Sequence, residues 1–195
     1  MSITKHNLVI APTEEPITLA EVKTYLGIDD TESDSLITSL ITSARMKVEY
    51  YLNKALVSQS WKVVFDAFPD EIELLKTPVQ SVTHIKYYDT GDSQQTLDSA
   101  YYYLDNYGES SSHFVLPSPG LVWPATYDRI NAVEVQYVAG IGTADDVQED
   151  IKQTLLQLVR LQLQLANPVE GFSAPTKAMD WILKDNLAYR RAYRL

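Results

Sequence analysis

The chain has 195 residues, contains no cysteine and carries a formal net charge of −10 at pH 7. The lack of cysteine excludes disulfides, thiolate metal sites and cysteine nucleophiles, and the acidic balance argues against a protein that grips nucleic-acid phosphates. No apolar run reaches the roughly 18 residues of a membrane span, and we expect no signal peptide at the start. The length predicts one domain, or one domain with a large insertion.

Residues 16–56 predict a short helix, a tight break and a long helix. Thr18 and Glu21 have the spacing of a capping box, and Gly27 can take the left-handed conformation that ends a helix. We expect the acidic run at 29–34 to cap the second helix. Apolar residues then recur at helical spacing, namely Leu36, Ile37, Leu40, Ile41, Ala44, Val48, Tyr51, Leu52 and Ala55. A stripe this wide must be buried, so its partner has to come from far along the chain.

After residue 56 the period of the pattern changes from helical to alternating. β-branched and aromatic residues at 59–68, 79–88 and 131–139 predict strands. Asp89 to Asp92 has the residues of a hairpin turn. Residues 1–15 are expected to form an extended arm with little to pack it.

The helical pattern returns at residue 146. Ile151, Leu155 and Leu158 belong to a stretch that is apolar almost all round, which is typical of a helix buried on several sides. This helix is the natural partner of the earlier stripe, and a last helix is predicted from 176 to 193. The predicted fold class is therefore α+β: a helical bundle body of residues 1–56 and 144–195 with an inserted β-rich domain, 57–143.

No motif in the chain predicts catalysis, a cofactor or a metal. The three histidines, His6, His84 and His113, lie in separate predicted elements with no ligand spacing around them. Gly140-Ile-Gly142 is a lone G-x-G without the third glycine of a phosphate loop, and there is no G-x-S-x-G nucleophile elbow. We therefore expect no catalytic residue, no bound cofactor and no metal ion.

The order of several short motifs resembles that of phage head–tail connector (adaptor) proteins, which occur in long-tailed phages and gene-transfer particles. These motifs are Pro16-Ile-Thr-Leu-Ala-Glu-Val, Leu40-Ile-x-x-Ala-Arg-x-x-Val-Glu49, Pro78-Val-x-Ser-Val-x-x-Ile-x-Tyr87, Trp123-Pro124, Val135-x-Tyr137-x-Ala139-Gly140 and Tyr189-Arg190. Each motif alone is weak, and their order and spacing carry the resemblance. It covers roughly residues 16–166, with a weaker match at 176–191.

The resemblance implies a structural protein of the virion neck, not an enzyme. Family members form a ring below the portal protein and join the packaged head to the tail or its stopper, after assembly in the host cytoplasm. A ring that matches the portal has about twelve subunits. DNA then passes through the lumen without specific binding, which suits an acidic chain.

The last segment carries the expected contact with the portal. Residues 176–195 hold five basic and two acidic residues and so carry +3, although the whole chain is acidic. The expected partner-binding residues are Trp181, Tyr189, Arg190, Arg191 and Arg194, because aromatic residues and arginine are enriched at interface hot spots. The alternative is that this helix packs back on its own body through Met179, Ile182 and Leu183.

Two other classes of function remain open from the residues alone. One is a soluble ligand-binding module built on the aromatic residues of the β-rich insert, which predicts a concave aromatic pocket. The other is a hydrolase with a dispersed carboxylate pair, such as Glu71 and Glu134, which predicts two carboxyl groups about 5–10 Å apart in one cleft. Neither explains the long apolar helix near residues 147–166.

Overall fold

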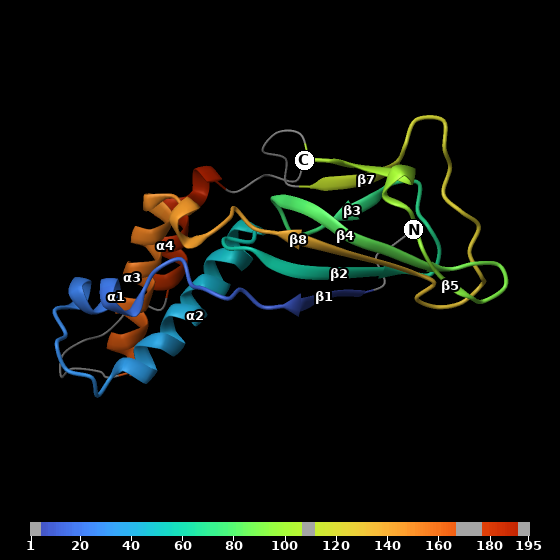
Figure 1. The fold of residues 1–195 in the computed structure, drawn as a ribbon. Helices are drawn as coiled ribbons and strands as arrows, with labels where there is room; N and C mark the ends of the chain where they lie inside the picture. Colours follow the sequence, from blue (N-terminus) through green and yellow to red (C-terminus); the bar gives the residue numbers. More distant parts are fainter. Residues whose placement is uncertain (1–4, 107–111, 167–176, 191–195) are drawn as a thin grey trace. The chain divides into compact units, whose positions relative to one another are not determined.

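The computed structural model describes residues 5–106, 112–166 and 177–190 (Figure 1). The chain folds into two compact units. Unit 1 comprises Met1–Thr13 and Ser58–Gly140, and unit 2 comprises Glu14–Val57 and Ile141–Leu195. The backbone therefore passes from one unit to the other three times.

Unit 1 is built from two antiparallel sheets (Figure 1). The larger sheet has the order β1-β2-β8-β4-β5, with β1 (Lys5–Ile10), β2 (Gln59–Phe65), β8 (Val133–Ala139), β4 (Val79–Tyr88) and β5 (Gln94–Thr96). The smaller sheet has the order β3-β7-β6, with β3 (Ile72–Leu74), β7 (His113–Pro117) and β6 (Tyr102–Asp105). A 3-10 turn, η1 (Ser99–Tyr101), precedes β6.

The alternating pattern predicted these strands well where one face is buried. Val133, Val135, Tyr137 and Ala139 of β8 are all buried, and the residues between them are partly exposed, as a period of two requires. The hairpin turn after β4 is confirmed: the Asp89 amide donates to the Ser93 carbonyl over 2.9 Å. The strand that returns from this turn is β5, whereas residues 102–105 form β6 and pair with β7 in the other sheet.

The first strand was not foreseen. Residues expected to form a loose arm make β1, which pairs antiparallel with β2 at the edge of the larger sheet. The His6 ring stacks on the Trp61 ring with 4.6 Å between centroids, and its Nε2 lies 2.9 Å from the Tyr137 hydroxyl. Six residues on a sheet edge carry too little pattern to be recognised without their partner strand.

The half-buried position of His6 predicts a stability that falls in mild acid. Burial, followed by the positive charge of Lys76, lowers the pKa of His6 from 6.5 to about 4. The unfolded chain therefore takes up the proton first, and stability present above pH 6.5 is lost as the pH falls towards 4. With allowance for the partial exposure of the ring, we expect this group to contribute about 1–2 kcal/mol of that loss.

Urea unfolding at pH 7.5 and pH 4.5 tests this expectation. His6→Gln should be less stable than the parent at pH 7.5 and should show a smaller loss between the two pH values. An identical pH dependence in both proteins would show that the His6 ring titrates in the folded protein as it does in the unfolded chain.

Unit 2 contains the helices α1 (Leu19–Leu26), α2 (Asp34–Leu52), α3 (Glu149–Ala166) and α4 (Ala178–Leu187) (Figure 1). Two 3-10 turns, η2 (Ala144–Asp146) and η3 (Ala188–Arg190), adjoin α3 and α4. The predicted capping box at Thr18 and Glu21 is present, and Gly27 ends α1 with φ at 69°. The cap that the acidic run was expected to supply for α2 is absent. Ser33 stands at the N-cap of α2, and its side chain makes no capping hydrogen bond.

The predicted pairing of the two long helices is confirmed by the core of unit 2. Ile41 and Val48 of α2 are buried in one cluster with the apolar face of α3, and Leu40 packs against its edge. The α3 members of that cluster are Ile151, Leu155, Leu156, Leu158 and Val159. α3 is buried on several sides, as its nearly continuous apolar sequence indicated.

The prediction of a helical bundle body is wrong. The described residues form a mixed α+β fold of four helices and two antiparallel sheets. In unit 2, α1 and α4 have only 8 and 10 residues, and residues outside the helices, Ile17, Leu56, Val57 and Val147, complete the core. Periodicity showed which helix faces are buried, but it could not show that short helices and connecting segments suffice to cover them.

Candidate interaction surfaces

One face of α4 packs against the core of unit 2, and the opposite face is exposed. Leu183 and Leu187 are buried, and Met179 and Ile182 pack at the edge of the same core. The opposite face presents Trp181, which is 64% exposed. The alternative in which this helix packs back on the body is therefore correct for its inner face, and the outer face keeps an aromatic residue available for a partner.

The 3-10 turn η3, which follows α4, is tied to the first turn of α3. Arg190 Nε and Nη2 donate to the two oxygens of Asp150 over 2.6 and 2.9 Å, and the Tyr189 hydroxyl donates to the same carboxylate. Burial raises the pKa of Asp150, but the hydrogen bonds from Arg190 and Tyr189 outweigh it and lower the pKa. Arg190 thus has a partner within its own unit, while Arg191 and Arg194 lie outside the described residues.

A second exposed face, on α2, was missed by the sequence reasoning. Met46 and Tyr50 lie one turn apart and are 60% and 86% exposed. The available signal was their i,i+4 spacing outside the buried stripe. A tyrosine this exposed buries a large apolar area when a partner covers it.

A groove lies between α1 and α3, with a volume of about 490 Å³. Its lining includes the apolar residues Ile17, Tyr25 and Leu156 and the charged residues Glu21, Glu149 and Lys152. No sequence signal marked it, because its two walls are far apart in the chain.

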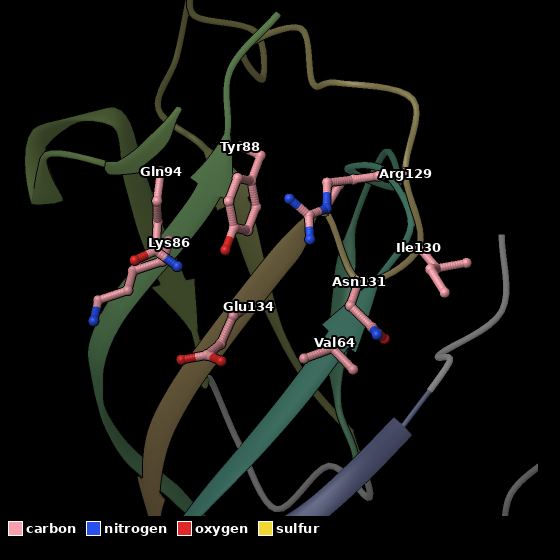
Figure 2. A pocket seen from close by; sticks show the side chains of 9 residues that line it. Val64, Lys86, Tyr88, Gln94, Arg129, Ile130, Asn131 and Glu134 are labelled. Atoms are coloured by element: carbon pink, nitrogen blue, oxygen red, sulfur yellow. The ribbon is translucent and has the colours of Figure 1, made fainter. Parts of the chain in front are cut away.

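Unit 1 has a hollow on the larger sheet, of about 340 Å³ (Figure 2). Glu134 lies in it and accepts hydrogen bonds from Lys62 at 3.0 Å and His84 at 3.2 Å. Arg129 stacks over the Tyr88 ring at 3.9 Å on the rim. The side chains of Figure 2 thus surround a mostly polar hollow.

This hollow does not provide the carboxylate pair of a hydrolase. Burial raises the pKa of Glu134, but the hydrogen bonds from Lys62 and His84 outweigh it, and the pKa is lowered. A carboxylate held ionised in this way cannot serve as the protonated acid that glycoside hydrolysis requires. Glu71, the other member of the pair, does not line the hollow.

The described part of the chain offers no group of three or more metal-ligating side chains. Among its helices, none is long and apolar enough to span a membrane.

Comparison with known proteins identifies a family for this chain. Residues 16–112 match the model of the phage gp6-like head–tail connector proteins. The chain belongs to the phage gp6-like head–tail connector family. The matched part of this connector contains α1, α2 and the strands β2 to β6, whereas β1, β7, β8, α3 and α4 lie outside it. The curated proteins include none that matches the connector.

The fold of the connector is shared with chains of gene transfer agent (GTA) particles. A chain in the neck of an empty GTA particle, computed with C6 symmetry, is 20% identical with a TM-score of 0.77, and the match covers 98% of the connector and 97% of that chain. A chain in the neck of a native GTA particle, computed with C12 symmetry, is 20% identical with a TM-score of 0.71 over 98% and 97%. A chain from the virion of a native GTA particle is 20% identical with a TM-score of 0.72 over 97% and 96%.

Proposed function

We propose that this chain is a structural subunit of the neck of a phage-like particle. Copies of it form a ring below the portal protein and join the packaged head to the tail or its stopper. The observation that carries the proposal is the match of residues 16–112 to the head–tail connector family. The likeness of nearly the whole chain to GTA neck chains supports the same placement.

The subunit acts by binding other proteins and not by catalysis. GTA neck structures computed with C6 and C12 symmetry support a rotationally symmetric ring, and a ring that matches the portal holds about twelve copies. Exposed apolar side chains on α2 and α4 supply surface for such contacts. The ring assembles in the host cytoplasm, and the acidic chain lets DNA pass through its lumen without specific binding.

The contact with the portal lies on the outer face of α4 and the segment that follows it. Trp181 and Tyr189 are exposed at 64% and 71%, and Trp is among the residues most enriched at binding hot spots. The ion pair between Arg190 and Asp150 holds this surface in place. Arg191 and Arg194 complete the proposed set and add positive charge towards an acidic partner.

Particles made without this protein test the assignment. We expect heads filled with DNA but no joined tails, because the part that connects the two is missing. Electron microscopy of purified particles measures the fraction that carries a tail, and the protein supplied in trans should restore it. Tailed particles at the normal level in its absence would contradict the connector role.

The portal contact is tested by Trp181→Ala. Because the side chain is mostly exposed, the variant should fold normally, yet portal affinity should fall by about 30-fold, equivalent to a hot spot of roughly 2 kcal/mol. Tyr103→Ala, which removes an exposed aromatic side chain on β6 of unit 1, is the control for loss of aromatic surface and should leave portal affinity unchanged.

A charge reversal completes the portal test. Arg191→Glu with Arg194→Glu should weaken portal binding most strongly at low salt, because exposed charge pairs are screened by ions. Calorimetry or surface plasmon resonance with purified portal measures both variants. Unchanged affinity in both would place the portal contact elsewhere on the subunit.

A further inference from the structure

The basic residues of unit 1 gather on one face of its larger sheet. Unit 1 contains five basic and eleven acidic residues. Four of the five basic residues lie on this face or on the rim of its hollow, namely Lys5, Lys62, Lys86 and Arg129. The fifth, Lys76, lies over the Trp61 ring. Positive charge is thus concentrated on one surface of an acidic unit, which we call the cationic face.

The strand register fixes the layout of the cationic face. Lys5 lies opposite Val64, and Val64 lies opposite Glu134. Lys86 follows on the other side of Glu134, so the four residues form one row across β1, β2, β8 and β4. At about 4.8 Å per strand, the Cα atoms of Lys5 and Lys86 are about 14 Å apart. The hollow opens along this row, because Val64, Glu134 and Lys86 belong to its lining (Figure 2).

The two cations at the ends of this row are available to a partner. Lys62 and Arg129 already have carboxylate partners, at 3.0 and 2.8 Å. The ammonium groups of Lys5 and Lys86 make no hydrogen bond or ion pair with the described residues. Two free cations are too few to grip a nucleic-acid backbone, which takes several phosphate contacts. They suit a short stretch of protein that carries two or three carboxylates.

The chain contains such a stretch between α1 and α2. Residues 29–32, Asp-Asp-Thr-Glu, are all exposed, and we call them the acidic stretch. In the part of the chain that the structure describes, no other four consecutive residues include three exposed carboxylates. The carboxylates of Asp29 and Glu32 have no partner there. Three residues span up to about 10 Å, and the flexible stems of the two lysines cover the few ångströms that remain.

We infer that the cationic face binds the acidic stretch of a second copy, and that this contact joins neighbouring subunits of the ring. Lys5 and Lys86 pair with Asp29 and Glu32, and the stretch enters the hollow beside Ile130, which is 73% exposed. Every subunit carries both surfaces, and because they differ the contact is heterologous and continues from copy to copy until a ring closes. The inference rests on the proposed function, which supplies the ring.

A disulfide ladder in assembled particles tests the contact. The chain has no cysteine, so Thr31→Cys in the acidic stretch and Thr96→Cys, opposite Lys86 on the cationic face, introduce one pair per subunit. We expect non-reducing gels of tailed particles to show covalent oligomers that extend to the full ring, because disulfides join Cβ atoms about 4 Å apart.

The matched control is Thr31→Cys with Gln95→Cys. Residue 95 precedes Thr96 on β5 and is exposed like it, but its side chain points to the opposite face of the sheet. The yield of covalent oligomers should be at least about 10-fold lower with this pair. Disulfides within single chains would show that the stretch contacts its own subunit and would overturn the inference.

An exchange of charges provides an independent test. In the Thr31→Cys, Thr96→Cys chain, Lys5→Glu with Lys86→Glu should lower the yield of covalent oligomers at least about 10-fold, because like charges then face each other. Adding Asp29→Lys with Glu32→Lys should restore the yield. An unchanged yield after the lysine reversal would overturn the inference, and weaker retention of DNA on filters by the same variant would then assign the cationic face to DNA.

The control for the exchange places the same charge change elsewhere. Asp70→Lys with Glu71→Lys alters two exposed carboxylates outside the acidic stretch and should not restore the yield. Restoration by this pair as well would show that net charge, and not the proposed contact, controls assembly.

The outcomes separate this inference from the proposed function. Tailed particles that contain the protein but give no ladder, or equal ladders from both cysteine pairs, overturn the inference and leave the neck role intact. Tailed particles that lack the protein contradict the neck role, and the inference falls with it.

Discussion

Leu155→Ala is expected to lower the free energy of unfolding by about 2–5 kcal/mol. Leu155 is 1% exposed and lies in the core shared by α2 and α3. Removal of its branched end deletes apolar contacts with both helices and leaves a cavity that the surrounding side chains fill only in part. Urea unfolding followed by the helical circular dichroism signal measures the change.

A leucine on the same helix serves as the control. Leu165 is 47% exposed, so Leu165→Ala changes the same atoms with little loss of burial and should cost less than about 0.5–1 kcal/mol. If Leu155→Ala cost no more than this control, the two long helices would not share the core that the structure shows. Because the chain has two units, the transition of each must be followed separately.

The helix pairing could be predicted because it depends on local spacing. Ile41 and Val48 repeat with the period of a helix, and only one other segment of the chain is apolar enough to cover them. The capping box at Thr18 and the stop at Gly27 follow in the same way from residues that are neighbours in sequence. These features need no knowledge of the tertiary fold.

The missed features all depend on partners distant in sequence. β1 is recognisable only from its pairing with β2, and the ion pair between Asp150 and Arg190 joins residues 40 positions apart. The groove likewise joins walls from both ends of the chain. No local pattern shows which distant segments meet. For this reason the sequence predicts a helical bundle body, whereas the structure has a more mixed arrangement of helices and strands.

A buried ion-pair network lies where the chain enters unit 2. Arg45 donates from Nε to Glu15 over 2.7 Å and from Nη1 to Glu49 over 2.9 Å, and its side chain is 8% exposed. The other oxygen of Glu49 accepts the Leu56 amide over 2.9 Å, and the Leu56 carbonyl accepts the Ile141 amide over 3.1 Å. The network therefore ties the unit 2 ends of all three chain crossings to α2.

Arg45→Met should lower the free energy of unfolding of unit 2 by about 3–5 kcal/mol, because it removes the guanidinium that pairs with the buried Glu49 carboxylate. Methionine fills much of the same volume, so the cost reports charge and hydrogen bonding more than packing. Thermal and urea unfolding at pH 7 measure it.

The matched control is Lys62→Met, which removes the cation from a pair with Glu134 whose side chains are 33% and 30% exposed. That change should cost about 0–1 kcal/mol, because water solvates the carboxylate that remains. Arg45→Met combined with Glu49→Met should recover part of the loss, since the buried carboxylate is removed together with the guanidinium. It should not recover all of it, because the Leu56 amide loses its acceptor. Equal costs for Arg45→Met and Lys62→Met would show that water reaches the Arg45 network and that it does not hold the chain crossings.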